Sequence, residues 1–153
     1  GRDAGFIALS SGISVGAEAI LIPETHTYMD DLIEKIEAGY KRKKLCHIIV
    51  VAEGDDAGGA MKVAELVKQK FDHIETRVSV LGHMQRGGAP SCNDRVLASR
   101  LGYASVMALL EGKWNYMVGV INDKIAYTPL SKANKQEPKI NQELINLVEV
   151  LSS

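Results

Sequence analysis

The feature that most constrains the fold is a continuous apolar run at residues 46–52, set between two segments with helical periodicity. A strand that is apolar on both faces is typical of a parallel sheet covered by helices on both sides. Residues 30–43 before it and residues 58–71 after it carry apolar side chains at helical spacing. The pattern predicts an α/β fold, a three-layer sandwich with a mainly parallel central sheet.

The rest of the chain continues this alternation. Further strands are expected at residues 19–22, 76–81, 116–121 and 124–128, and further helices at residues 4–12, 91–111 and 141–151. Ser91 followed by Asp94 predicts a capping box, and Gly112 predicts the end of that long helix. We expect an α/β domain over residues 1–123. Residues 124–153 would form a strand or loop, a polar stretch and a helix, whose packing stays open.

Composition and cysteine spacing argue against several classes of partner. The net charge of −1 predicts no general attraction to nucleic acid or to an anionic membrane, and the apolar runs are too short to cross a bilayer. Cys46 and Cys92 lack the spacing of a zinc site or a disulfide framework, which favours a reducing cytoplasm. The opening Gly1-Arg2-Asp3 shows no secretory signal. It predicts a chain cut within a larger protein, with a processed start as the alternative.

The most informative loop follows the strand expected at residues 76–81. Its sequence, Gly82-His83-Met84-Gln85-Arg86-Gly87-Gly88, places two donors among glycines that let the backbone approach a ligand closely. Arg86 can hold a phosphate through two parallel hydrogen bonds, and the helix that begins near Ser91 directs free N–H groups to the same side. The loop indicates a site for phosphate or a sugar phosphate; a polar loop with solvated charges is the alternative.

Other polar residues allow two interpretations each. Glu53 follows an apolar strand, so its carboxylate is either an acceptor for sugar hydroxyls or an ordinary strand-end residue. The basic run at residues 41–44 either complements a helix dipole or forms an anion site. Asp55-Asp56 is interpreted as a solvated turn rather than a metal site. Three histidines without an evident partner are interpreted as surface or packing residues: His26, His47 and His73.

Four stretches, in order along the chain, are similar to one protein family. They are residues 1–9 (GRDAGFIAL), 16–24 (GAEAILIPE), 75–90 (ETRVSVLGHMQRGGAP) and 94–102 (DRVLASRLG). Together they resemble the carboxy-terminal half of the bacterial-type phosphofructokinases, and the resemblance extends from residue 1 to about residue 121. It implies half of the phosphofructokinase fold in a homo-oligomer, with a homotetramer as the expected form.

The resemblance implies a glycolytic enzyme that transfers a phosphoryl group from Mg-ATP to fructose 6-phosphate, giving fructose 1,6-bisphosphate. Gly1 and Arg2 match the end of a Met-Gly-Arg motif, and Arg2 would neutralise charge in the transition state. Glu53 matches a carboxylate that holds the sugar hydroxyls. The loop residues that match contacts to the sugar phosphate are His83, Met84, Gln85 and Arg86.

Arg77 matches an arginine that reaches the 6-phosphate of a sugar bound to a neighbouring subunit. Six residues of extended chain separate it from His83, or roughly 20 Å. One chain can hardly bring both side chains to one phosphate, so oligomerisation is part of the functional expectation.

The resemblance also implies an allosteric site. Gly16 and Glu18 match positions where the glutamate meets the magnesium of a bound nucleoside diphosphate, and Arg42 and Lys44 are the closest matches in the basic run. The implied effector is a nucleotide or a phosphoenolpyruvate-type anion, with Glu18 as the residue that faces its magnesium.

Motifs that the family uses for the phosphoryl donor are missing from this chain. They are the glycine-rich donor loops and the Thr-x-Asp-x-Asp segment that supplies the catalytic base. The chain is therefore expected to hold no Mg-ATP and to be inactive alone. ATP is favoured as donor because the chain is compact and resembles the short bacterial enzymes. A pyrophosphate-dependent relative and a non-catalytic phosphosugar-binding or regulatory module are the alternatives.

Overall fold

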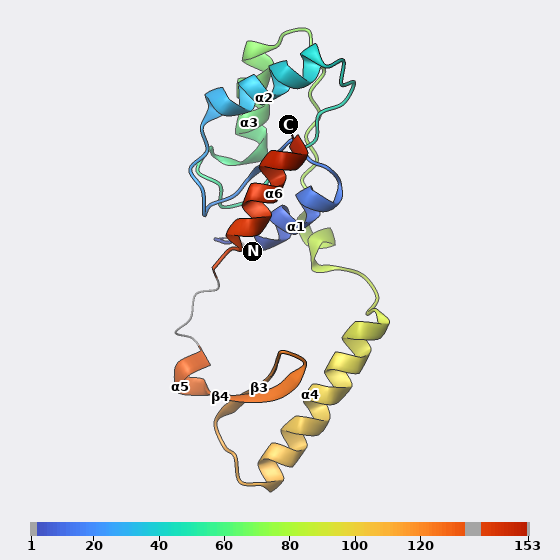
Figure 1. The fold of residues 1–153 in the computed structure, drawn as a ribbon, viewed down its shortest axis with the longest axis vertical. Coiled ribbons are helices and arrows are strands. Elements are labelled where there is room, and N and C mark those ends of the chain that lie inside the picture. The colour runs from blue at the N-terminus through green and yellow to red at the C-terminus, as the bar shows by residue number, and fades with distance from the viewer. Residues whose placement is uncertain (1–2, 134–138, 153) are drawn as a thin grey trace. The chain divides into compact units, whose positions relative to one another are not determined.

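The computed structural model describes residues 3–133 and 139–152. The elements, in chain order, are α1 Phe6–Ser14, β1 Ala19–Leu21, α2 Met29–Lys41, β2 Ile49–Val51, α3 Gly59–Lys70, the 3-10 helix η1 Gly82–Arg86, α4 Cys92–Leu110, β3 Tyr116–Ile121, β4 Lys124–Pro129, α5 Leu130–Ala133 and α6 Gln142–Ser152 (Figure 1). Contacts divide the chain into two compact units. The first is Gly1–Gln85 with Ile140–Ser153, and the second is Arg86–Lys139.

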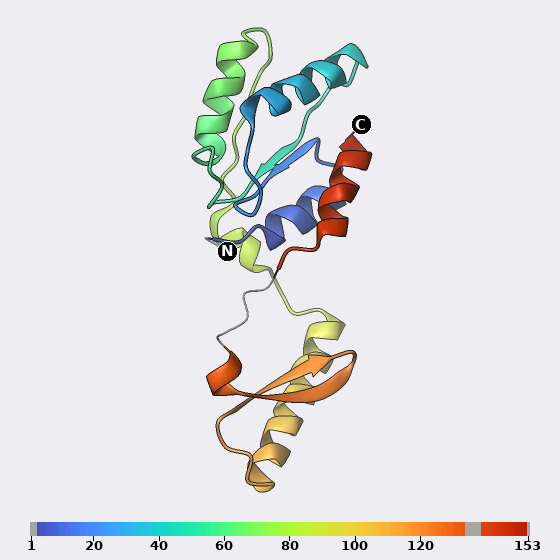
Figure 2. The ribbon, with the colours of Figure 1, turned by 60° about the vertical axis from the view of Figure 1, so that its left-hand side comes forward.

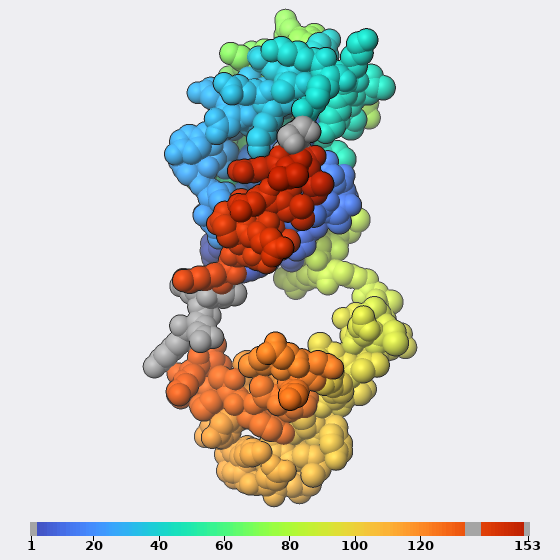
Figure 3. Space-filling view, in the orientation of Figure 1, coloured from blue at the N-terminus to red at the C-terminus, as the bar shows by residue number. Residues whose placement is uncertain are grey.

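The first unit is built on a parallel pair of strands. β1 and β2 align Ala19 with Ile49 and Leu21 with Val51. α1 and α6 pack against each other and against β1, and α3 contacts β2. Figure 2 shows α1 and α6 on one side of the strands and α2 and α3 on the other, and Figure 3 shows α6 in red beside α1 in blue. The α/β class expected from the sequence is therefore confirmed, with the parallel sheet between two helical layers.

The core of this unit lies between the sheet and the α2 and α3 layer. The buried residues of the cluster are Ala19, Leu21, Leu32, Ile36, Val63, Val67 and Phe71. Leu32 and Ile36, and likewise Val63 and Val67, are four residues apart, so each pair lies on one face of its helix. Burying each large apolar side chain stabilises the fold by about 1.5–3 kcal/mol. The helical periodicity seen in the sequence thus identified the face that packs on the sheet.

The second unit joins the long helix α4 to the β3–β4 hairpin. The Ser91 hydroxyl accepts the Asp94 N–H at 3.2 Å, and Asp94 accepts the Ser91 N–H at 2.8 Å, which confirms the capping box. These contacts with Ser91 hold the pKa of Asp94 below its ordinary value. At the hairpin turn, Arg100 donates to the carboxylate and the carbonyl oxygen of Asp123, each at 2.6 Å. This double contact fastens the hairpin to α4.

One expectation about the strands needs correction, and the expected domain division can be compared with the two units. Residues 76–81 are not a strand, because the described residues offer that segment no neighbouring strand with which to form a ladder. β3 and β4 pair antiparallel, and Ile121 lies opposite Lys124. The division expected after residue 123 therefore falls inside a hairpin turn and does not coincide with the two units. Residues 134–138 of the expected polar stretch lie outside the described residues.

Candidate functional site

A cluster of charged side chains surrounds Glu18 at the amino ends of β1 and β2. The Glu18 N–H donates to the carbonyl of Ile48 at 2.8 Å, which brings the residues before the two strands together. The carboxylate has no exposed surface. Its Oε2 accepts a hydrogen bond from Nδ1 of His47 and lies 3.1 Å from Nζ of Lys44. Its Oε1 lies 3.7 Å from Nη2 of Arg42. We call Glu18, Arg42, Lys44 and His47 the Glu18 cluster.

The end of α2 positions the two cations of this cluster. Lys43 adopts a left-handed conformation with φ 61°. Its N–H donates to the carbonyl of Tyr40 at 2.9 Å, and the Lys44 N–H donates to the carbonyl of Gly39 at 3.0 Å. These are the two bonds of a Schellman motif, formed here with lysine at the left-handed position where glycine is usual. The motif reverses the chain, so that Arg42 and Lys44 both reach the buried carboxylate.

Gly16 ends α1 in the same way. It has φ 64°, its N–H donates to the carbonyl of Ile13, and the Ala17 N–H donates to that of Gly12. This motif turns the chain from α1 into β1 and delivers Glu18 to its place. Gly16, matched to the allosteric site by resemblance, therefore shapes the approach to the cluster through its backbone.

A second polar network joins the loops that follow β1 and β2. The buried carboxylate of Asp55 accepts the Thr27 hydroxyl at 2.7 Å and the Ala57 N–H at 3.0 Å. Asp56 accepts the Thr27 N–H at 3.1 Å and pairs with His26. Burial raises the pKa of Asp56, but the contacts with Thr27 and His26 outweigh it and leave the pKa below its ordinary value. Hydrogen bonds from Thr27 to Asp55 and Asp56 thus join the two loops.

This network corrects the interpretation of Asp55, and together with the Glu18 cluster it supplies partners for two histidines. The side chain of His26 is 64% exposed, so His26 is a surface residue as interpreted. Asp55 is only 6% exposed, so the interpretation as a solvated turn is wrong for Asp55, whereas Asp56 is exposed. His26 and His47 each bind a carboxylate. Both histidines face partners more than 28 residues away in the sequence, and local sequence patterns carry no signal for such contacts.

Glu24, in the loop after β1, contacts the residue that precedes α1. The Gly5 N–H donates to both carboxylate oxygens of Glu24, at 2.9 and 3.1 Å. Glu53 lies two residues beyond β2 and is exposed, at the carboxyl end of the sheet as expected. Gly1 and Arg2, predicted for substrate and catalysis, lie outside the described residues.

The predicted phosphate loop forms η1 and is exposed throughout. Gly82–Arg86 includes His83, Met84 and Gln85, and the contact division separates Arg86 from the first unit. Arg77 forms an ion pair with Glu75, with Nη2 at 2.7 Å from Oε1. Within residues 3–133 and 139–152, no hydrogen bond or ion pair joins Glu53 to the η1 side chains, so the structure does not bring these two sets of predicted residues into contact.

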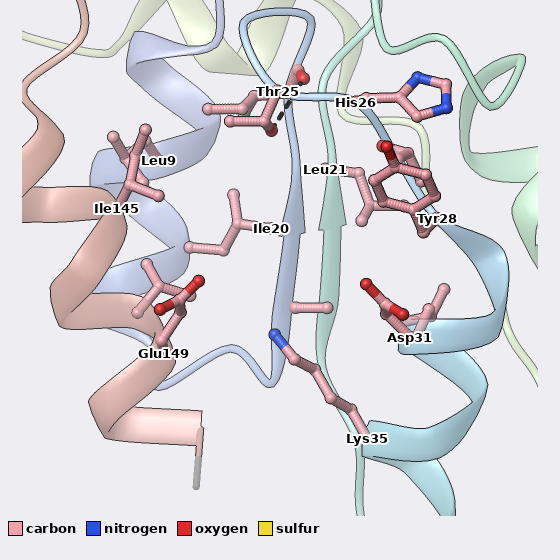
Figure 4. A pocket seen from close by; sticks show the side chains of 15 residues that line it. Leu9, Ile20, Leu21, Thr25, His26, Tyr28, Asp31, Lys35, Ile145 and Glu149 are labelled. Carbon is pink, nitrogen blue, oxygen red and sulfur yellow. Dashed lines mark hydrogen bonds between the residues drawn. The ribbon is translucent and has the colours of Figure 1, made fainter.

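A cavity of about 190 Å³ lies elsewhere, between β1, α1, α2 and α6. Figure 4 shows Leu9, Ile20 and Ile145 lining one part of it, with Lys35 near its edge. None of the residues predicted for binding lines this cavity. The candidate site residues therefore lie outside this cavity, in the loop after β2 with Glu53, in η1 and in the Glu18 cluster.

The described part of the chain shows neither a metal-binding cluster nor a membrane-spanning helix. There, no group of three or more His, Cys, Asp or Glu residues could hold a metal ion. No helix of that part has both the length and the apolar character needed to span a membrane.

Comparison with known sequences gives a consistent family. Residues 1–109 match the sequence profile of the family described as Phosphofructokinase. The chain is 47% identical over 152 residues to ATP-dependent 6-phosphofructokinase 2 of Bacteroides thetaiotaomicron, covering 99% of this chain and 47% of that protein. It is 44% identical to ATP-dependent 6-phosphofructokinase 1 of Thermus thermophilus, with the same coverage. The chain thus spans about half the length of the curated relatives it matches.

Solved structures show the same relationship in the fold. Phosphofructokinase from Saccharomyces cerevisiae superposes with a TM-score of 0.75 at 31% identity, covering 99% of this chain and 21% of that chain. A pyrophosphate-dependent phosphofructokinase from Marinobacter aquaeolei superposes with a TM-score of 0.80 at 24% identity, covering 100% of this chain and 46% of that chain. The second likeness concerns the fold alone. From the family profile and the identity to its relatives, the chain belongs to the phosphofructokinase family.

Proposed function

We propose that this chain is the half of a 6-phosphofructokinase that binds fructose 6-phosphate and an allosteric effector. The complete enzyme transfers the γ-phosphoryl group of ATP to the C1 hydroxyl of the sugar. The new bond joins the C1 oxygen to phosphorus, and the bond between the γ-phosphorus and the bridging oxygen of ADP breaks. The observation that carries this proposal is the 47% identity, over 99% of the chain, to a relative named ATP-dependent 6-phosphofructokinase 2.

The residues of this chain bind and orient the sugar. Glu53 is exposed beyond β2, where a carboxylate can accept hydrogen bonds from sugar hydroxyls. His83 and Arg86 are exposed on η1, with Met84 and Gln85 between them, and donate to the 6-phosphate. Arg2 neutralises charge on the phosphoryl group in transfer. The proton of the C1 hydroxyl goes to a base that the other half supplies, so the chain alone is inactive.

Magnesium accompanies ATP in such transfers and neutralises charge that develops on the phosphates. Because the donor motifs are missing from this sequence, we assign none of its residues to Mg-ATP. Arg77 is assigned to the site of a neighbouring subunit, which makes a homo-oligomer part of the proposal. Its guanidinium is exposed and forms an ion pair with the nearby Glu75, which a phosphate can replace as partner.

A pyrophosphate donor is the second candidate. The Marinobacter aquaeolei structure that shares this fold is named pyrophosphate-dependent. The relatives from Bacteroides thetaiotaomicron and Thermus thermophilus are named ATP-dependent at much higher identity, so ATP is our assignment.

The test has a binding arm and an activity arm. Fructose 6-phosphate is titrated by calorimetry into the chain and into the variants His83→Ala and Arg86→Ala, with His73→Ala as the matched control. We expect saturable binding that each loop variant weakens by roughly tenfold or more and that His73→Ala leaves unchanged. Equal binding by all four proteins would show that η1 is not the site.

For the activity arm, the chain is joined to the part of the Bacteroides thetaiotaomicron relative that the match does not cover. We expect phosphorylation of fructose 6-phosphate with ATP by the joined protein and none by the chain alone. Turnover with pyrophosphate only would establish the second candidate. Sugar phosphate binding without turnover from either donor would favour a non-catalytic module.

A further inference from the structure

Asp55 connects two consecutive turns that follow β2. Its N–H donates to the carbonyl of Ala52 at 3.2 Å and closes the first turn, in which Glu53 and Gly54 are the central residues. Its carbonyl accepts the Gly58 N–H at 3.4 Å and closes the second turn. The first four-residue turn therefore ends at Asp55, and the second begins there. The position of Glu53 thus depends on where Asp55 is held.

The side chain of Asp55 is buried, and both of its oxygens accept hydrogen bonds. Oδ1 accepts the Ala57 N–H at 3.0 Å within the same loop, and Oδ2 accepts the Thr27 hydroxyl at 2.7 Å from the loop after β1. A carboxylate is costly to bury unless hydrogen bonds compensate for the lost water. Because apolar replacements of buried ionic groups are often neutral for stability, this arrangement favours a role in fixing the conformation of the two loops.

The turn that contains Glu53 is held at both ends. At one end, the Ala52 N–H donates to the carbonyl of Leu21 at 2.9 Å and continues the contacts between β1 and β2. At the other end, Asp55 is joined to Thr27. Glu53 itself is exposed, so the backbone of the turn decides where its carboxylate lies. A binding group must be held within about 0.5 Å of its productive position by the residues that support it.

We propose that Asp55 is a positioning residue for sugar binding: through its hydrogen bond with the Thr27 hydroxyl, it fixes the turn that presents Glu53 to the hydroxyls of the sugar phosphate. The inference rests on the sugar-binding role of Glu53 in the proposed function. Asp55 and Thr27 act through the backbone of the turn, so neither has to contact the sugar. Both loops follow the carboxyl ends of parallel strands, where ligands of such sheets bind.

The first experiment removes the hydroxyl that holds Asp55. Fructose 6-phosphate is titrated by calorimetry into the chain and into Thr27→Val, Thr27→Ser and Thr25→Val. Thr27→Val should weaken binding by about three- to tenfold, whereas Thr27→Ser keeps the hydroxyl and should bind within about twofold of wild type. Thr25→Val is the matched control, because the Thr25 hydroxyl donates within its own loop, to the carbonyl of Ile22 at 3.4 Å. It should leave binding unchanged.

A double-mutant cycle with Glu53→Gln tests whether Asp55 and Thr27 act through Glu53. Glu53→Gln alone should weaken binding by roughly tenfold or more, because it removes the charge of the acceptor. In that background, Thr27→Val should weaken binding by less than about twofold further. Asp55→Ala should show the same dependence on Glu53. A loss of folded protein would instead lower binding equally in both backgrounds.

The outcomes distinguish this inference from the function on which it rests. If the wild-type chain does not bind fructose 6-phosphate, the sugar-binding role is overturned, and the inference with it. If wild type binds but Glu53→Gln binds equally well, the inference fails while sugar binding by η1 stands. The inference also fails if Thr27→Val binds as tightly as Thr25→Val, or if its loss is the same with and without the Glu53 carboxylate.

Discussion

Gly39 controls how closely α2 approaches the Glu18 cluster. A β-carbon at this position would lie 2.5 Å from Cε1 of His47 and 2.6 Å from Oε1 of Glu18. Only glycine leaves both side chains where they are. Glu18, Arg42 and Lys44 were expected together from the family resemblance, whereas Gly39 and His47 were not. Their importance comes from contacts across 21 and 29 residues of chain, which no local pattern reveals.

Gly39→Ala is expected to destabilise the protein, although alanine is the better helix former. The added carbon displaces His47 or Glu18 from a packed site, at a cost of about 1–3 kcal/mol. The measurement is the free energy of unfolding in urea, followed by circular dichroism. Gly102→Ala is the matched control, because it lies inside α4 and, apart from the adjacent residues and the backbone of that helix, no atom lies within 4 Å of the added carbon. It should stabilise the helix by about 0.5–1 kcal/mol. A Gly39→Ala protein as stable as the control would refute this account.

The conformation of a loop or helix end is predictable when residues close in sequence determine it. It is not predictable when contacts with distant segments determine it. The capping box of α4 was predictable, because Ser91 and Asp94 are three residues apart. The hydrogen bond from Thr27 to Asp55 was not predictable, because it joins the hydroxyl of one loop to a buried carboxylate of another, 28 residues apart. Residues 76–81 have the composition of a strand, but a strand also needs a neighbour. In the described part of the chain they have none.

Thr27→Val should lower the free energy of unfolding by about 1–3 kcal/mol, because it leaves the buried carboxylate of Asp55 without the hydroxyl that donates to it. Thr76→Val makes the same chemical change at a buried hydroxyl with no hydrogen-bond partner in the described residues. That variant should be neutral or more stable, since no bond is lost. Equal destabilisation of the two variants in urea unfolding would show that the hydrogen bond from Thr27 to Asp55 does not stabilise the fold.

The two units differ in how much apolar surface they bury. The first holds the whole core cluster, from Ala19 to Phe71. In the described part of the second unit, the buried apolar residues are Ala104 and Ala108, while Tyr103, Leu110 and Trp114 are exposed. Its sheet is a single hairpin, and isolated hairpins are marginally stable at best. The small buried apolar surface predicts that the second unit is the less stable of the two.

Amide hydrogen exchange should therefore distinguish the units within one sample. We expect the amides of the β3–β4 hairpin to exchange faster than those of α2 and α3, by roughly tenfold or more, since local opening costs least where few apolar side chains are buried. The core helices serve as the internal reference. Equal protection of both regions would mean that the second unit is stabilised by interactions beyond those described.

The sequence by itself determined where α2, α3, α4 and the strands β3 and β4 lie, because periodicity and capping residues act over a few positions; the antiparallel pairing of β3 with β4 came from the structure. By resemblance it also indicated the family and the convergence of Glu18 with Arg42 and Lys44. Only the tertiary structure decided that Glu18 is fully buried, that His47 binds it, and that Asp55 accepts a hydrogen bond from Thr27. These contacts join segments 28 or 29 residues apart. Their geometry follows from how helices pack on a sheet, which local sequence does not specify.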